Sequence, residues 1–231
     1  MGRSVVYAGA ARCPRCSLPP RWCICDALPA VTTRLHVHVL IHRHEHVKPS
    51  STGRLVARTV TDASCHVYQR ANRFYPAAGW PDGLVPPGDT LWIAHPAGEP
   101  VPAADVAPPG RLHLLLLDGT WRQAGEMLRS VEGRGWCVRL PDADHGPSRS
   151  WLRTQPTAGA LATAEALLGF LRLVGDHEAE RLLRLHLELH VYATLLSRGR
   201  REMAERYLVD SPLRQATPSP LDRLHARGPS V

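Results

Sequence analysis

The stretch Leu114-Leu115-Leu116-Leu117-Asp118-Gly119-Thr120-Trp121 carries the strongest structural signal in this chain. A short, continuous apolar run is typical of a strand that is buried on both faces, as in parallel α/β sheets. Helix-compatible sequence follows at once, so the polar residues stand at the carboxyl end of that strand, where such sheets bind ligands. An ordinary strand-to-helix turn accounts for the pattern equally well, with Asp118 or Thr120 capping the helix and Trp121 packing.

Hydrophobic patterning on either side of this stretch predicts an α/β fold with a largely parallel sheet. Strands are expected over about residues 35–41, 65–68, 90–94, 112–117 and 136–140. Helices are expected over about residues 53–61, 122–130, 163–174 and 178–197. Because strands and helices alternate along the chain, most strands should run parallel.

Three regions are expected along the chain. Residues 1–30 form a small N-terminal unit, residues 31–210 form the α/β domain, and residues 211–231 form a loose tail rich in proline and arginine. With 231 residues, the chain is long enough for one such domain with a sizeable core. We expect a monomer, with a homodimer as the alternative.

The charge of the chain favours a polyanionic partner. It carries 28 Lys and Arg against 21 Asp and Glu, a net charge of +7, and Lys48 is its only lysine. Arginine makes bidentate contacts to phosphate and stacks on bases, although codon bias in a GC-rich genome explains the arginine excess equally well. Because no run of 18 apolar residues and no signal peptide is evident, we expect a cytoplasmic protein without a membrane span.

Four of the six cysteines lie within a short N-terminal segment, in the pattern Cys13-x2-Cys16-x6-Cys23-x-Cys25. Disulfides are unfavourable in the cytoplasm, so this spacing favours zinc. Four thiolates complete a tetrahedral site with no open position, which indicates a structural zinc knuckle rather than a catalytic metal. Cys65 and Cys137 are isolated and are expected in the core.

Five histidines, His36, His38, His42, His44 and His46, would share one face of an extended strand. Such a strand would be long, and no partner cluster of metal ligands stands beside it in the sequence. We therefore expect surface or RNA-facing histidines rather than a metal site.

Several common enzyme signatures are missing. The chain contains no G-x-G-x-x-G, no Walker A loop and no G-x-S-x-G, so dinucleotide, NTPase and hydrolase functions lose their usual support. Residues 150–166 instead form a long polar segment that leads into a helix, with Thr163 suited to the N-cap and Glu165 to the first turn. A long loop of this kind in a small domain is usually functional.

Four blocks of the chain, taken together, resemble the DTW-domain family, the tRNA-uridine aminocarboxypropyltransferases. The blocks are the cysteine segment, Lys48-Pro49-Ser50-Ser51-Thr52-Gly53-Arg54-Leu55, Asp118-Gly119-Thr120-Trp121, and residues 153–166. They occur in the order of the family and cover most of residues 13–175. One departure is visible, because this chain has Ser51 where the family typically has Asn before Thr-Gly, which puts a hydrogen bond near the pocket in question.

The resemblance implies a SPOUT-like fold, an α/β domain whose C-terminal chain is threaded into a trefoil knot, preceded by the zinc knuckle. It implies S-adenosylmethionine as donor and tRNA as acceptor. The 3-amino-3-carboxypropyl group would move to N3 of a uridine, with 5′-methylthioadenosine as the second product. The cofactors implied are thus S-adenosylmethionine as co-substrate and a structural Zn²⁺.

The resemblance also implies roles for individual residues. Asp118 is the candidate catalytic residue, either removing the N3 proton or orienting the base. Trp121 is expected to pack beneath the turn rather than to shape the pocket. The residues implied to bind the donor are His95, Pro96, Asp118, Gly119, Thr120, Trp121, Arg153, Thr154, Thr163 and Glu165. The candidates for phosphate contact are Lys48, Arg54, Arg58 and Arg122.

Two other functions remain open at the level of the sequence. A SPOUT-type RNA methyltransferase would share the fold and the donor but transfer a different carbon. A zinc-knuckle RNA-binding protein would bind RNA without catalysis.

Overall fold

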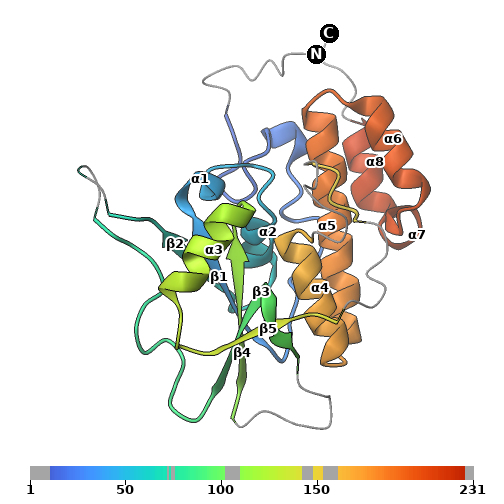
Figure 1. Cartoon of the computed structure of the whole chain (residues 1–231). Helices are drawn as coiled ribbons and strands as arrows, with labels where there is room; N and C mark the ends of the chain where they lie inside the picture. The colour runs from blue at the N-terminus through green and yellow to red at the C-terminus, as the bar shows by residue number, and fades with distance from the viewer. Residues whose placement is uncertain are drawn as a thin grey trace.

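A five-stranded parallel sheet lies at the centre of the molecule, as the alternating sequence predicts (Figure 1). Every pair of neighbouring strands is parallel. The computed structural model describes residues 11–71, 73, 76–101, 110–141, 148–152 and 161–226. In the spatial order β2-β1-β4-β3-β5, the strands are β2 (Ser64–Tyr68), β1 (His36–His42), β4 (Leu112–Asp118), β3 (Thr90–Pro100) and β5 (Trp136–Arg139).

Helices follow most of the strands. The described part of the chain contains η1 (Pro20–Trp22), α1 (Arg43–His46), α2 (Thr52–Thr59), α3 (Trp121–Ser130), α4 (Thr163–Leu173), α5 (His177–Ser197), α6 (Arg201–Val209), α7 (Leu213–Ala216) and α8 (Pro218–Ala226). None of these helices is long and apolar enough to cross a membrane.

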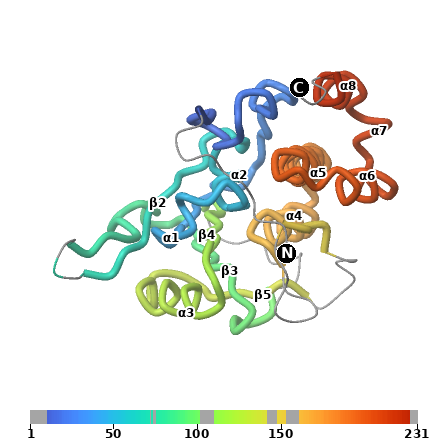
Figure 2. The backbone as a smooth tube through the Cα atoms, turned by 90° about the horizontal axis from the view of Figure 1, so that it is seen from above, coloured from blue at the N-terminus to red at the C-terminus, as the bar shows by residue number. Residues whose placement is uncertain are grey.

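The two faces of the sheet are covered by different helices. Alternation along β4 sends Leu114 and Leu116 into a large core shared with α2, α4 and α5, while Leu115 packs with Met127 of α3. Figure 2 shows α3 on one side of the strands and α4 and α5 on the other. The expectation that the leucine run is buried on both faces is therefore confirmed.

The C-terminal region is more ordered than its composition suggests. Leu213, Leu221 and Leu224 are buried in the same core as the sheet, so the expectation of a loose tail is wrong for residues 213–226. The proline content misled the prediction, because proline is favourable in the first turn of a helix and Pro218 begins α8. Helix α6, with Tyr207 buried, was also missed.

Strand β3 runs farther than expected. Its predicted end at Ala94 is where the ladder with β5 is interrupted, because Ala94 and Glu99 both pair with Val138. The intervening residues bulge out before pairing resumes. A Cβ atom at Gly98 would lie 2.6 Å from the backbone of Cys137, so this bulge requires glycine at its closest approach to β5.

The two isolated cysteines do not belong to the core. Cys65 is exposed on the edge strand β2, and Cys137 in β5 is only half-buried. The expectation that both are core residues is wrong, because each lies on a strand at the edge of the sheet, where fewer neighbours cover the side chain.

Candidate active site

A cavity of about 780 Å³ opens at the carboxyl ends of β3, β4 and β5. Its apolar walls include Ala94, Leu116, Val138, Leu140 and Phe170, and its polar lining comes from the strand ends and from the first turns of α2, α3 and α4. The carboxyl edge of a parallel sheet is the usual position of ligand sites in α/β folds, and the volume suits a small-molecule ligand.

Among the described residues that line this cavity, Asp118 is the only acidic one. It ends β4, and only 5% of its surface is exposed. Its Oδ2 accepts a hydrogen bond from the Ser51 hydroxyl at 2.7 Å, and its Oδ1 accepts one from the Thr163 hydroxyl at 2.5 Å. Because Ser51 precedes α2 and Thr163 begins α4, the carboxylate joins three separate elements at one point.

Helix α2 starts unusually close to this carboxylate. A Cβ atom at Gly53 would lie 2.6 Å from the Cβ and Cγ atoms of Asp118, so only glycine fits there without displacement. Ser51 caps α2 by accepting the Arg54 backbone N–H at 3.1 Å while it donates to Asp118. The hydrogen bond put in question by the change from Asn to Ser is therefore present.

The first turn of α3 confirms that Thr120 caps the helix, but it contradicts the packing predicted for Trp121. Thr120 caps the helix, and Gln123 completes a capping box by accepting the Thr120 N–H at 2.8 Å. Trp121 is 45% exposed and lines the cavity, so the expectation that it packs beneath the turn is wrong. The capping box holds Trp121 at the first helical position, where its ring faces the cavity rather than the core.

The residues at the start of α4 have other roles than those predicted. Its N-cap is Ala162 rather than Thr163, which leaves the Thr163 hydroxyl for Asp118. The Glu165 carboxylate accepts backbone N–H groups from Ala162 at 2.8 Å, Arg149 at 2.7 Å and Ser150 at 3.1 Å. Glu165 thus fastens residues 148–150 to the helix and does not line the cavity.

The remaining predicted donor-binding residues fall into two groups. The structure places His95, Pro96, Gly119 and Thr120 in the lining of the cavity beside Asp118 and Trp121. Arg153 and Thr154 lie outside the described residues.

The four predicted phosphate contacts are dispersed. Arg122 is exposed and lines the cavity next to Trp121. The Lys48 ammonium donates to the buried carboxylate of Glu45 at 2.6 Å.

Two arginines of α2 point toward the cysteine segment instead. Arg54 donates to the Ser17 hydroxyl at 2.8 Å, and Arg58 lies 3.9 Å from the Cys25 sulfur and 3.4 Å from His190 Nδ1. Burial lowers the pKa of Arg58. The Arg58 side chain is thus directed at the thiols, and its contact with phosphate stays a prediction.

Sequence reasoning missed several residues of the cavity. Arg139 ends β5, Ser150 lies between β5 and α4, and both line the cavity with Thr52 of α2. The strand-end rule that identified Asp118 applies equally to Arg139, so that residue was accessible from the sequence. Ser150 and Thr52 lie in stretches that the sequence singled out, but their individual place at the cavity depends on long-range packing that no local pattern records.

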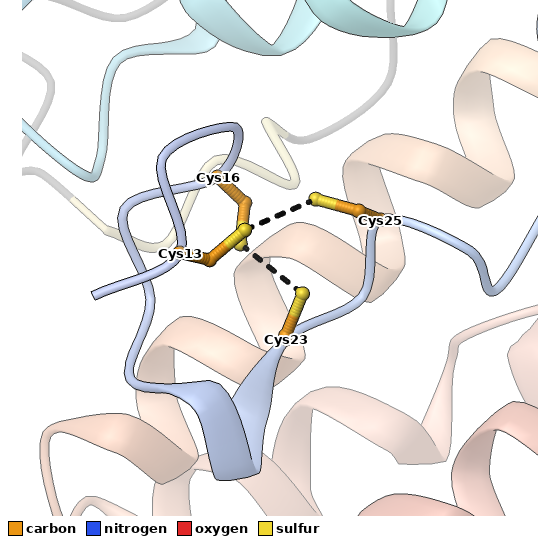
Figure 3. A group of neighbouring side chains, drawn as sticks. All are labelled: Cys13, Cys16, Cys23 and Cys25. Atoms are coloured by element: carbon orange, nitrogen blue, oxygen red, sulfur yellow. Dashed lines mark hydrogen bonds between the residues drawn. The ribbon is translucent and has the colours of Figure 1, made fainter. Parts of the chain in front are cut away.

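The four N-terminal cysteines converge as their spacing predicts (Figure 3). Their sulfurs all lie within 4.8 Å of one another, with 3.7 Å between Cys13 and Cys25 and 3.9 Å between Cys16 and Cys23. Four sulfurs at 2.3 Å from a zinc ion lie about 3.8 Å apart in a regular tetrahedron, so the cluster fits such an ion. Burial opposes ionisation of Cys13, but hydrogen bonds from the Cys16 and Arg15 backbone and from neighbouring cysteine side chains outweigh it and lower the pKa of this thiol to about 6. Burial raises the pKa of Cys23 and Cys25 instead.

A second polar cluster occupies the amino ends of the strands. His113 of β4 lies 3.1 Å from Asp89 and 2.8 Å from His38 of β1, and His38 lies 2.6 Å from the Ser64 hydroxyl, which also contacts His66 at 2.9 Å. Within the described ranges, the cysteine cluster is the only group of three or more His, Cys, Asp or Glu side chains placed to hold a metal.

The prediction of surface histidines holds for some positions and not for others. His44 and His46 are exposed, but His38 and His42 are buried. The shared parity is broken because the strand ends and α1 begins at Arg43.

A parallel α/β sheet whose strand ends hold a cavity with a buried carboxylate, hydroxyls and an indole defines an enzyme-like domain for a small ligand. Residues 10–195 match the family described as the DTW domain, and the chain belongs to that family.

Two curated relatives support this placement. The chain is 25% identical over 207 residues to tRNA-uridine aminocarboxypropyltransferase A of Arabidopsis thaliana, covering 77% of this chain and 78% of the relative. It is 28% identical over 159 residues to tRNA-uridine aminocarboxypropyltransferase 2 of Drosophila melanogaster, covering 67% of this chain and 62% of the relative. No solved structure matches the chain.

Proposed function

We propose that this protein transfers the 3-amino-3-carboxypropyl group of S-adenosylmethionine to N3 of a uridine in tRNA. Its curated relatives are named as tRNA-uridine aminocarboxypropyltransferases, which supports the transferred group and the tRNA acceptor. The observation that carries the proposal is Asp118, a buried carboxylate at the wall of the strand-end cavity, oriented by Ser51 and Thr163. Membership of the DTW domain family supports the same assignment.

The reaction requires N3 of uridine to displace a thioether. N3 forms a bond to the γ-carbon of the methionine part, the bond from that carbon to the sulfonium sulfur breaks, and its electron pair stays on sulfur. The products are 3-(3-amino-3-carboxypropyl)uridine and 5′-methylthioadenosine. The sulfonium activates three attached carbons alike, so the walls of the cavity must select the γ-carbon by position.

Asp118 can assist this step in either of two ways. Each carboxylate oxygen accepts one protein hydroxyl and keeps a second acceptor position, so the N3–H of a bound uridine has a place to donate. The N3 proton then passes to Asp118, or Asp118 orients the base while the proton leaves to solvent. Both roles need the fixed orientation that the two hydroxyls provide.

The rest of the cavity divides between donor and RNA. His95, Pro96, Gly119, Thr120 and Thr163 line it and would contact the donor. Trp121 and Arg122 are exposed at the start of α3, where an indole and a guanidinium suit base stacking and phosphate contact at the entrance.

We propose that Cys13, Cys16, Cys23 and Cys25 hold a structural zinc ion. The tetrahedral spacing of their sulfurs supports this ion, and a set of four thiolates leaves no position for substrate. Bound there, the ion would stabilise a segment that has little regular structure besides η1.

The finer fold assignment, a SPOUT-like domain with a C-terminal trefoil knot, also stays a proposal. Its support is the convergence at one cavity of residues that follow β3, β4 and β5 with the start of α4. An experimental structure traced through residues 141–162 would test it by establishing whether the chain passes through a closed loop.

Donor labelling tests the proposed reaction directly. The protein is incubated with unmodified tRNA and S-adenosylmethionine that is labelled either on the methyl group or on the carboxyl carbon. Incorporation from the carboxyl label alone is the expected result. Incorporation from the methyl label alone would identify a methyltransferase instead, and tRNA binding without incorporation from either would identify an RNA-binding protein.

A further inference from the structure

His95 presents an unpaired hydrogen-bond donor beside the cavity. Its Nδ1 accepts the backbone N–H of Ala97 at 3.1 Å, and an imidazole that accepts at Nδ1 must carry its proton at Nε2. The Nε2 atom is buried and makes no hydrogen bond within the described part of the chain. Burial also lowers the pKa of His95, which keeps the ring neutral with this tautomer.

The bulge in β3 holds the His95 ring, and with it the Nε2–H group, in place. Ala94 precedes His95 and Glu99 follows the bulge, and both pair with Val138 of β5, so the loop is fixed at its two ends. Gly98 approaches the backbone of Cys137 too closely for any side chain, which fixes the loop against the sheet. A buried donor without a partner costs stability, and His95 lines the cavity, so a ligand that supplies the acceptor would remove this cost.

The surroundings of His95 differ from those of Asp118. His95 follows Ala94 in β3, whose outer neighbour is β5, and the lining contributed by this region is largely apolar, with Pro96, Val138 and Leu140. Arg139 of β5 is the charged residue on this side, while the carboxylate of Asp118 and the hydroxyl groups of Thr52, Thr120 and Thr163 gather around the end of β4. A flat ring with apolar faces and acceptor nitrogens suits the His95 side, while the charged methionine part of a donor suits the other.

We propose that His95 Nε2–H donates a hydrogen bond to a ring nitrogen of the adenine of S-adenosylmethionine, and so selects an adenosine-bearing donor. This inference rests on the proposed function, because it takes that donor as the ligand. His95 is then a specificity-determining residue for the donor rather than a group that acts on the transferred carbon.

The test is a binding cycle with 5′-methylthioadenosine and its 1-deaza, 3-deaza and 7-deaza analogues, each of which replaces one ring nitrogen acceptor by C–H. Calorimetric titrations compare wild type, His95→Phe, and the matched control His44→Phe, which changes an exposed histidine outside the cavity lining. We expect wild type and the control to bind one analogue about tenfold more weakly than the parent compound. His95→Phe should bind the parent about tenfold more weakly and no longer distinguish it from that analogue.

The outcomes that overturn the inference are distinct. If wild type binds all three analogues as tightly as the parent, His95 does not contact a ring nitrogen, and this result needs no folded variant. If His95→Phe discriminates among the analogues as wild type does, the contact comes from another group. If wild type binds neither S-adenosylmethionine nor 5′-methylthioadenosine, the proposed function fails together with the inference.

Steady-state kinetics supply a second readout. His95→Phe should raise the KM for S-adenosylmethionine with little change in kcat, because the adenine is remote from the reacting carbon. A loss confined to kcat would assign His95 to the chemical step and contradict the inference.

Discussion

Both ends of the parallel sheet concentrate ionisable side chains. At one end these side chains are paired with one another, and at the other they keep hydrogen-bonding positions open toward a cavity. At the amino ends, Asp89, His113, His38 and Ser64 hydrogen-bond to one another. At the carboxyl ends, Asp118 keeps free acceptor positions toward a cavity of about 780 Å³. A dense group of titratable residues is therefore a poor guide to a site here, while polar groups left open beside a cavity are a good one.

The proton positions at the amino end follow from its terminal carboxylate. Asp89 accepts from His113 Nε2–H, so His113 Nδ1 must accept from His38 Nε2–H, and His38 Nδ1 must accept from the Ser64 hydroxyl. Ser64 is then left to accept from His66. Each hydrogen bond thus has one donor and one acceptor, and none of the ring nitrogens in these bonds is left to bind a substrate.

The largest effect is expected at the carboxyl end. Asp118→Asn should lower kcat for aminocarboxypropyl transfer by about 10²- to 10³-fold, because the amide removes the acceptor for the N3 proton and disturbs two hydroxyl donors. Product nucleoside analysis measures this loss, and filter binding with tRNA serves as the control, since RNA affinity should persist. Unchanged kcat would remove the functional distinction between the two ends.

Gly53→Ala should impair the carboxyl end of the sheet because the added methyl group displaces Asp118 or α2. The added Cβ would lie 2.6 Å from Asp118, so the carboxylate or α2 must shift. We expect about 1–3 kcal/mol loss of stability and about a tenfold or greater loss of kcat. The matched control is Gly125→Ala in α3, where the nearest atom is the flexible end of Arg129 at 3.8 Å; it should stabilise the protein by about 0.5–1 kcal/mol.

At the amino end, the same logic predicts a loss of stability without a loss of function. His113→Phe should lower the free energy of unfolding by about 1–3 kcal/mol, since it leaves the buried His38 N–H without an acceptor. Chemical denaturation measures the loss, and kcat at saturating substrate should match wild type. A variant of normal stability and impaired kcat would show that the two ends are not functionally separate.

The amino end should also make stability depend on pH. Burial, with smaller contributions from His113, His66 and His36, lowers the pKa of His38 from its ordinary value of 6.5 to about 4. The unfolded chain then binds the extra proton between these values, so stability falls as the pH drops from about 6.5 toward 4. We expect about 2 kcal/mol from this residue, allowing for solvent screening, and a flatter profile in His38→Gln.

The smallest effect is expected at Ser51, where the family typically has Asn. Ser51→Asn should change stability by less than about 0.5 kcal/mol and retain activity, because Asn caps helices as well as Ser and also offers a donor to Asp118. Ser51→Ala, which removes both interactions, should cost about 1 kcal/mol. Equal behaviour of the two variants in thermal unfolding would show that the hydroxyl contributes little.

The sequence was most informative where one local rule sufficed. Hydrophobic runs located the strands, the cysteine spacing located the thiol cluster, and the strand-end position located Asp118. It was less informative where distant packing decides: Thr163 was free to face Asp118 only because Ala162 took the cap, and Arg58 turned inward only because the cysteine segment folds over α2.

Composition misled the predictions in a different way. Proline and arginine after residue 210 predicted disorder, but Leu221 and Leu224 lie on a helical face that reaches the core. Local patterns likewise did not predict that His38 of β1 would bond to His113 of β4, or that His113 would bond to Asp89 in the segment before β3. Such pairings are set by strand order, which no local pattern encodes.

Helix α2 has a consequence for any measurement on this protein. Ser51 at its start holds Asp118, while Arg54 and Arg58 reach Ser17 and Cys25 in the cysteine segment. Eight residues of helix span only about 12 Å, so the same short helix contacts both the thiol cluster and the Asp118 carboxylate. Loosening of the N-terminal segment during purification would thus appear as lost turnover, and the specific activity of a preparation would report the integrity of its thiols as much as its catalytic quality.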